Sequence, residues 1–239
     1  METTTLDISF PTLPSTMSEV EEFIASGQTD PEPLIDIIKR DPSTSVNVLR
    51  RANSAYYGVQ REVDSVGQAV RLLGFIEVTS IVMLDGVNEM REQFTANADL
   101  LRRIMHTSVF TGRFTQQLAC QLGLADEWTR PAFSAGFIHV MGRLVLLYSA
   151  PDRYETLVEA QDKLLPEADA ERRVFGESHR TLAPRASDHW NLPDRIHSIL
   201  ESAADPSDLS DDDRKTLSIA IRAGSDNRNR FRRSWTVLA

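Results

Sequence analysis

The sequence is poor in cysteine and lacks the features of a secreted or membrane protein. The 239 residues include one cysteine, Cys120, so no intrachain disulfide can form and a reducing compartment is expected. The amino terminus has no basic start followed by an apolar run, and the most apolar stretch, 137–150, is interrupted by His139 and Arg143. These absences argue against a signal peptide or a membrane span and predict a cytoplasmic protein.

Positive charge is also scarce. The chain has 26 Lys and Arg residues against 35 Asp and Glu residues, a formal net charge of −9. Nucleic acid and anionic membranes attract positive surfaces, so this balance argues against both as general partners. The exception is a basic segment with interleaved aromatics, 228–235. We expect that segment to contact the protein body or a partner protein, with nucleic acid as a weaker alternative.

Strand-like alternation of apolar and polar residues is almost missing. Apolar residues recur every three or four positions, which predicts an all-α fold, a compact bundle of many helices. Asp41-Pro42 has the form of a helix start, and Ser65 precedes a helical run that stops at Gly74. Longer helices are expected over 98–122, 131–149, 178–190 and 193–202.

No internal repeat or low-complexity tract divides the chain. The expected divisions are an N-terminal tail, a main domain of two closely packed helical subdomains, a C-terminal capping helix and a basic tail. Their bounds are 1–9 for the first tail, 10–205 for the main domain (subdomains 10–93 and 94–205), 206–224 for the capping helix and 225–239 for the basic tail.

Four segments of the amino-terminal half identify a family. They occupy 13–14, 37–42, 48–58 and 65–74, and the third ends in Ala-Asn-Ser-Ala-Tyr-Tyr-Gly. In this order and spacing the chain resembles the HDOD domain, a bacterial module related to the HD and HD-GYP phosphohydrolases. The resemblance covers about residues 10–205. It implies an all-α HD-like bundle and a phosphohydrolase fold reused for signalling or scaffolding.

The third segment has two interpretations. Asn53 at the end of a helical run can bond backbone groups at the helix terminus, and Gly58 permits a positive φ, which together predict a helix stop with a packed aromatic corner. Alternatively, Asn53, Tyr56 and Tyr57 line a groove in which the rings stack on a nucleobase. The structural interpretation is preferred.

The resemblance also assigns the histidines and exposes a missing group. His106 stands at the first histidine ligand of HD proteins, His139 at the histidine of the His-Asp pair, and His179 at a downstream histidine of HD-GYP relatives. The aspartate of the pair is replaced by Val140, which cannot ligate a metal or help to place the attacking water. The paired histidines expected near 202–203 and the Gly-Tyr-Pro tripeptide are missing too. We therefore predict no catalytic residue, no metal and no cofactor.

The remaining polar residues predict a vestigial ligand pocket made of His106, His139, Arg143 and His179. A guanidinium beside His139 could bind a phosphate or carboxylate in a bidentate manner, through two hydrogen bonds. The structural alternative gives Arg143 a salt bridge to an acid such as Asp152, or a solvated position, and makes the histidines ordinary hydrogen-bonding residues.

Three further residues are candidates to substitute for the missing carboxylate. Glu177, Asp188 and His189 fit ordinary helix-end or surface positions better. His197, on an amphipathic helix, is expected to face solvent or a polar boundary.

The predicted function is a non-catalytic HDOD regulator in bacterial signal transduction. Its partners would be signalling proteins and a small anionic ligand. The competing hypothesis is a metal-dependent phosphohydrolase or phosphodiesterase with a reduced ligand set of His106, His139 and His179.

Overall fold

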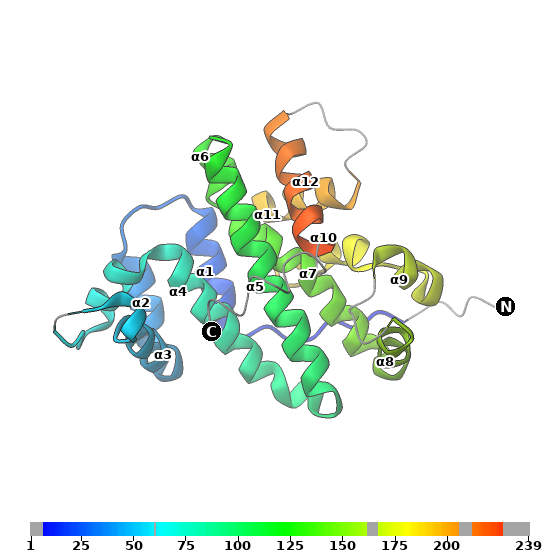
Figure 1. Ribbon diagram of the computed structural model, residues 1–239, viewed down its shortest axis with the longest axis horizontal. Helices are drawn as coiled ribbons and strands as arrows, with labels where there is room; N and C mark the ends of the chain where they lie inside the picture. The colour runs from blue at the N-terminus through cyan, green and yellow to red at the C-terminus, as the bar shows by residue number, and fades with distance from the viewer. Residues whose placement is uncertain (1–6, 60, 162–166, 206–211, 227–239) are drawn as a thin grey trace. The chain divides into compact units, whose positions relative to one another are not determined.

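The computed structural model describes residues 7–59, 61–161, 167–205 and 212–226. Within these ranges the regular structure is helical, without a strand, which confirms the predicted all-α fold. The chain divides into two compact units, one of residues Thr12–Glu92 (unit 2) and one of Met1–Pro11 with Gln93–Ala239 (unit 1). The helices of each unit are labelled in Figure 1.

Unit 2 is built of four α-helices and one short 3-10 helix. They are α1 (Ser15–Ala25), α2 (Glu32–Arg40), α3 (Pro42–Ala52), η1 (Ala55–Tyr57) and α4 (Val66–Met90). Asp41 caps α3, since its side chain accepts hydrogen bonds from the backbone N–H groups of Ser43 and Thr44. The predicted break at Gly74 is also present, with φ 75° and ψ 167°, but a second helical stretch follows it directly within α4.

The aromatic segment after α3 is held by Asn53. Its amide donates to the carbonyls of Leu49 and Val63 at 3.0 and 2.8 Å, and its oxygen accepts from the N–H of Val63 at 2.8 Å. These bonds tie the end of α3 to the chain ten residues later. Asn53 therefore has the helix-stop role of the structural interpretation, while the Tyr56 side chain lies at the surface, 74% exposed.

Besides Met1–Pro11, unit 1 contains the chain from Gln93, a residue within the 3-10 helix η2 (Arg91–Asn97), and the helices that follow. They are α5 (Ala98–Gln121), α6 (Asp126–Thr129), α7 (Ala132–Ser149), α8 (Pro151–Ala160), α9 (Ala168–Phe175), α10 (His179–His189), α11 (Asp194–Ala204) and α12 (Asp212–Asp226). The expected helices over 98–122, 131–149, 178–190 and 193–202 correspond to α5, α7, α10 and α11, with ends that agree within two residues.

Helix α7 is the centre of unit 1. It packs against α5, α8, α10, α11 and α12, and its residues from Ala132 to Leu147 are all buried (Figure 1). It is long and apolar enough to cross a membrane by length and composition, yet 89% of that stretch is buried inside the protein. Such complete burial is typical of a core helix. Charged or polar side chains on α7 therefore need hydrogen-bond or ionic partners inside the protein.

The two ends of unit 1 also pack on its body. Near the amino terminus, the indole N–H of Trp190 donates to the carbonyl of Pro11 at 2.8 Å, and Ser9 bonds Ser149. At the other end, α12 buries Leu217 and Ile221 in a shared apolar cluster, as expected of a helix that covers the bundle. The basic segment 228–235 lies outside the described residues.

Candidate functional site

The polar centre of unit 1 is formed where α7 meets the start of α10. His139 and Arg143 are four residues apart on α7 and therefore share one face of the helix, while His179 is the first residue of α10. All three are at most 1% exposed, and the rings of His139 and His179 meet edge to face with centroids 5.1 Å apart.

A glycine permits this close meeting. A Cβ atom built on Gly142 would lie 2.1 Å from the carbonyl oxygen of His179, well inside the closest contact that real Cβ atoms make. The backbone of α10 therefore begins directly against α7. The glycine and the basic residue that follow His139 in the sequence thus have separate structural roles, one of them steric and the other electrostatic.

The partner of Arg143 is Glu171 on α9. Nε of Arg143 donates to Oε1 of Glu171 at 3.1 Å, and both side chains are at most 1% exposed. The other oxygen, Oε2, accepts from the backbone N–H of His179 at 2.8 Å and from its Nδ1 at 2.6 Å. Arg143 thus forms the salt bridge to an acid that the structural alternative predicts, but its partner is Glu171 and not Asp152. The solvated position is wrong, because the Arg143 side chain is buried.

Sequence reasoning missed Glu171, although a signal for it exists. The buried positions of α9 are Ala168, Glu171 and Phe175, spaced by three and four residues. Glu171 thus replaces an apolar residue on the inward stripe of an amphipathic helix. A charged residue in such a stripe predicts a buried partner of opposite sign.

His106 does not join the cluster. Its side chain is exposed, whereas Ile104 and Met105 on the same helix are buried. Successive residues of an α-helix are rotated by about 100°, so His106 is turned well away from the face that Ile104 and Met105 bury. The structure brings together His139, Arg143 and His179 of the predicted pocket and leaves His106 out, since helix periodicity outweighs the motif position.

Burial and charge set the protonation of the cluster. Burial lowers the pKa of His139 well below its ordinary value, and the nearby His179 and Arg143 lower it further. Burial and Arg143 also lower the pKa of His179 to about 4, against the opposing pull of Glu171. Near pH 7 both rings are therefore neutral.

Glu171 behaves in the opposite way. Burial alone would raise its pKa, but the charge and hydrogen bonds of His179 and the charge of Arg143 lower it to about 2. Because His179 is neutral near pH 7, the Arg143 charge and the two bonds from His179 are what stabilise the carboxylate there. The neutral ring of His179 donates through Nδ1, which leaves its Nε2 as an acceptor.

The donor atoms do not fit the metal site of an HD hydrolase. Val140 is fully buried and brings no ligand, and both oxygens of Glu171 are already engaged. Among the described residues, no three His, Cys, Asp or Glu side chains converge so that they could hold a metal ion. His139 and His179 alone supply two imidazoles, fewer than the three protein ligands of catalytic zinc sites.

The other candidate polar residues lie elsewhere in unit 1. His197 contacts Asp188 through Nδ1 at 2.9 Å and Glu201 through Nε2 at 3.4 Å, and its side chain is 25% exposed. Glu177 lies just before α10 and bonds Thr181 and Arg185 of that helix. His189 is exposed and stacks on Phe10.

Comparison with protein families identifies the domain. The sequence profile of the HDOD domain matches residues 10–206. This chain belongs to the HDOD domain family. A comparison with curated protein sequences finds no match.

Solved structures share the HDOD fold at low sequence identity. An HDOD domain protein of unknown function from Geobacter sulfurreducens is 18% identical with a TM-score of 0.65, covering 90% of this chain and 72% of that one. A protein provisionally assigned to signal transduction from Marinobacter aquaeolei VT8 is 20% identical with a TM-score of 0.68, covering 92% and 52%. A provisionally assigned phosphohydrolase from Shewanella amazonensis SB2B is 20% identical with a TM-score of 0.60, covering 95% and 82%.

These likenesses extend to the fold and no further. The HDOD chain spans about half the length of the Marinobacter protein, so that protein contains parts with no counterpart among the aligned residues. Identities of 18–20% carry no residue roles across. The function must therefore be argued from the cluster itself.

Proposed function

We propose that this HDOD protein is a non-catalytic regulatory module of bacterial signal transduction, which acts by binding a partner protein or a small ligand. One observation carries the proposal. The position after His139 holds the buried Val140, and the carboxylate that the fold does place in the cluster, Glu171, is committed to Arg143 and His179. Metal-assisted hydrolysis needs ligands that hold the ion and leave a position for water, and this set offers two imidazoles.

The family membership and the neighbours supply the context for this proposal. The Marinobacter structure is provisionally assigned to signal transduction, and its fold is shared over 92% of the present chain. A fold built for hydrolysis that keeps its scaffold and lacks its ligands suits a binding role. The partners we propose are signalling proteins, together with a small anionic ligand.

A metal-dependent phosphohydrolase is the second candidate, and one observation favours it. Both ring nitrogens of His139 and Nε2 of His179 have no hydrogen-bond partner among the described residues. An imidazole nitrogen in that state can ligate a metal. The Shewanella structure is provisionally assigned as a phosphohydrolase, but its 20% identity carries no activity to this chain.

Elemental analysis separates the two candidates. The protein would be purified without chelators or a metal-binding tag, analysed by mass spectrometry, and assayed with bis(p-nitrophenyl) phosphate with and without added Mn²⁺. The proposal expects metal at background level and no hydrolysis above that of a His139→Ala variant. Near-stoichiometric metal, with hydrolysis that His139→Ala abolishes, would establish the phosphohydrolase instead.

A further inference from the structure

The carboxylate of Glu171 is bound in the way that proteins bind a small oxyanion ligand. Its two oxygens receive three N–H groups, from Nε of Arg143, the backbone N of His179 and Nδ1 of His179, at 2.6–3.1 Å. A cationic fork, a neutral imidazole and a backbone amide are the donors typical of carboxylate and phosphate sites. None of the three donors comes from α9, the helix that carries Glu171.

The donors come instead from α7 and α10. The backbone donor is the first residue of α10, an eleven-residue helix whose amino-terminal N–H groups favour negative charge. Arg143 is 1% exposed, and its guanidinium nitrogen Nη1 has no hydrogen-bond partner among the described residues. A buried cation with an unused donor indicates that this place can satisfy more anion than Glu171 supplies.

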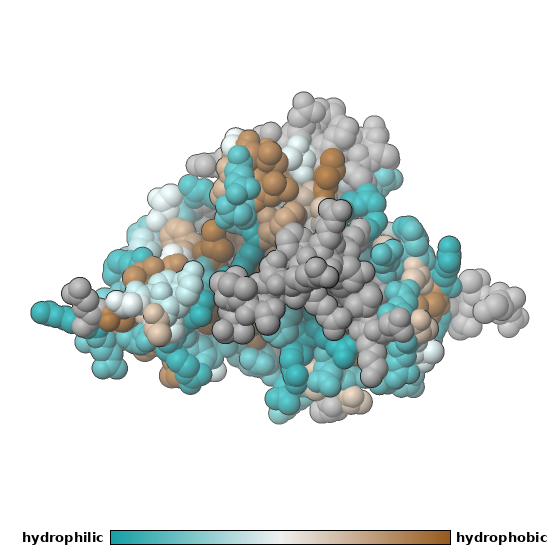
Figure 2. Space-filling model, viewed as in Figure 1, coloured by the Kyte–Doolittle hydropathy of each residue, from teal (hydrophilic) through white to brown (hydrophobic). Residues whose placement is uncertain are grey.

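Helix α9 is anchored by few side chains. Of its eight residues, Ala168, Glu171 and Phe175 are buried, and Phe175 stacks on Tyr154 of α8 with centroids 6.2 Å apart. Asp169, Arg172 and Arg173 are exposed. Figure 1 places α9 at the outside of unit 1 beside α8, and Figure 2 shows a mostly hydrophilic surface there. The buried side chains that hold α9 inward are thus Glu171, Ala168 and Phe175. Arg153 of α8 adds a hydrogen bond to the Val174 carbonyl and lies over the Phe175 ring.

We propose that Glu171 is the built-in occupant of an oxyanion site formed by α7 and α10, and that a small carboxylate or phosphate competes with it for Arg143 and His179. Binding of that ligand releases the inward hold of α9, so occupancy of the site becomes a change at the protein surface. The inference rests on the proposed function, because it names the ligand class of a binding module and the helix that would report it.

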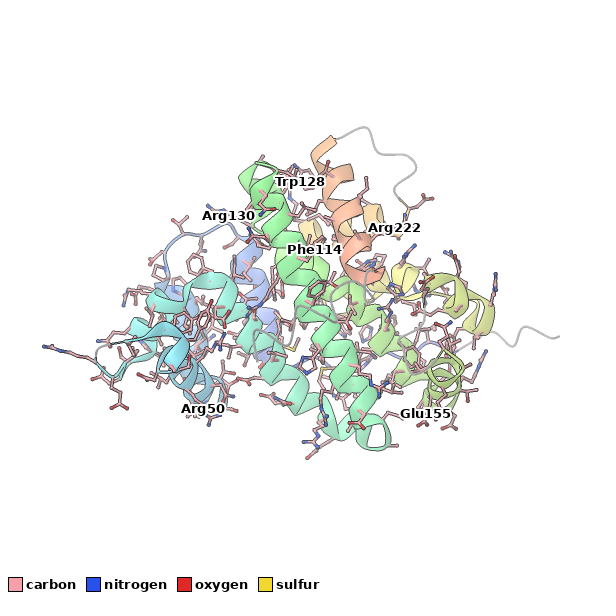
Figure 3. All side chains as sticks on the ribbon, viewed as in Figure 1. Arg50, Phe114, Trp128, Arg130, Glu155 and Arg222 are labelled. Atoms are coloured by element: carbon pink, nitrogen blue, oxygen red, sulfur yellow. The ribbon has the colours of Figure 1, made fainter. Side chains whose placement is uncertain are left out.

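The main test empties the site and refills it. Glu171→Ala removes the carboxylate and opens space for formate or acetate, as in chemical rescue. Thermal unfolding would be followed in formate, acetate, phosphate and chloride at matched ionic strength, with acetamide as the uncharged counterpart of acetate. Glu155→Ala, at an exposed position on α8 (Figure 3), is the matched control.

A specific site predicts selective stabilisation. Formate or acetate at tenfold its dissociation constant should raise the midpoint of Glu171→Ala by about 3–5 °C relative to chloride. Acetamide should not. Wild type and Glu155→Ala should respond far less than Glu171→Ala, because in both of them Glu171 competes with the added anion for the same donors. The response should vanish in Glu171→Ala/Arg143→Met. Equal shifts in the control, or a response that survives loss of Arg143, would contradict the site.

A second variant keeps the test decisive if Glu171→Ala does not fold in chloride. Folding restored by formate alone would support the site. If formate does not restore it, Phe175→Ala is used, which keeps every donor and weakens only the hold of α9. Calorimetry should then detect inorganic phosphate binding at least tenfold tighter than to wild type, and equal binding would overturn the inference. Because these assays read binding, their failure leaves the metal and hydrolysis test with its own separate result.

Discussion

Two buried carboxylates, one in each unit, show how surroundings decide the cost of a charge. Glu171 in unit 1 has a buried guanidinium and two N–H donors of His179, and its pKa falls to about 2 although burial opposes this. Asp85 in unit 2 is 9% exposed and has one amide donor, Asn47, at 2.8 Å, while its Oδ2 has no hydrogen-bond partner among the described residues. Burial raises the pKa of Asp85, and the nearby Asp41 adds to the rise.

Burial alone therefore does not mark a functional carboxylate. The cost of burying the Glu171 charge is offset by its partners, so the carboxylate stays ionised in the core, as an anion-binding site requires. Asp85 links α3 to α4 through Asn47, and burial, with too little compensation, raises the pKa of its carboxyl group. Removing the counter-charge of Glu171 should therefore destabilise the protein, whereas removing the charge of Asp85 should change its stability little.

Removing the cation should have the largest effect. Arg143→Met leaves Glu171 ionised and unpaired in the core, so the free energy of unfolding should fall by about 3–5 kcal/mol. Urea unfolding measures it. The double variant Arg143→Met/Glu171→Leu should regain most of the loss, because it leaves no buried charge. Arg102→Met, at an exposed pair with Asp99, is the control and should change stability by less than about 1 kcal/mol. A loss of that small size in Arg143→Met would contradict the account.

The steric basis of the cluster gives the next effect. Gly142→Ala places a methyl group against the backbone of His179 and should cost about 2–3 kcal/mol, although alanine normally stabilises a helix interior relative to glycine. Gly67→Ala in α4 is the matched control, because its nearest contact is the mobile end of the Arg71 side chain at 3.1 Å. The free energy of unfolding, measured with urea, should fall much more in Gly142→Ala than in Gly67→Ala, or change in opposite directions in the two variants. Equal changes would mean that α10 can move away from α7 at little cost.

Acid should weaken the cluster through its neutral histidines. With ordinary values of 6.5 in the unfolded chain and pKa values lowered in the fold, His139 and His179 bind protons mainly when the chain unfolds. The free energy of unfolding should therefore fall as pH drops below 6.5, by up to about 1.4 kcal/mol per pH unit for each histidine, until about pH 4 for His179.

Glu171 extends the fall in the free energy of unfolding to lower pH, whereas Asp85 contributes a change of opposite sign. The lowered pKa of Glu171 adds a loss between pH 4.5 and about 2, whereas the raised pKa of Asp85 makes its contribution decline as pH rises above 3.8. Urea unfolding at pH 7, 6 and 5 tests the histidine part. His139→Gln should flatten the profile, and a flat wild-type profile would contradict the burial of neutral rings.

The smallest change is expected at Asp85. Asp85→Asn keeps the acceptor for Asn47 and removes a charge that burial disfavours, so stability at pH 7 should stay within about 1 kcal/mol of wild type, on the stabilising side. Glu171→Gln, the same chemical change in unit 1, should instead destabilise, because it leaves Arg143 without its counter-charge. Equal changes in the free energy of unfolding for the two substitutions would contradict the claim that the charge of Glu171 is compensated and that of Asp85 is not.

The sequence predicted the fold well because helix periodicity is local. Apolar spacing and caps identified the long helices of unit 1, and Gly74 was identified as a break because only its backbone geometry was at issue. What followed Gly74 was not predicted, since a helix that resumes after a kink depends on packing.

The site was predicted only in part because its geometry depends on which faces meet. His139, Arg143 and His179 do meet, but His106 shares the family position without sharing the buried face. Glu171 was missed because it belongs to no motif and approaches from another helix. A charge on an apolar helix stripe was the available clue.

The most direct test of the central claim is the ¹⁵N NMR spectrum of the His139 and His179 rings, recorded without chelator and during addition of Zn²⁺. The account predicts neutral rings near pH 7, with His179 protonated at Nδ1, and ring nitrogen shifts that Zn²⁺ leaves unchanged. Changes in the ring nitrogen shifts that show both histidines binding stoichiometric Zn²⁺ would contradict a closed, charge-compensated cluster and would favour the phosphohydrolase.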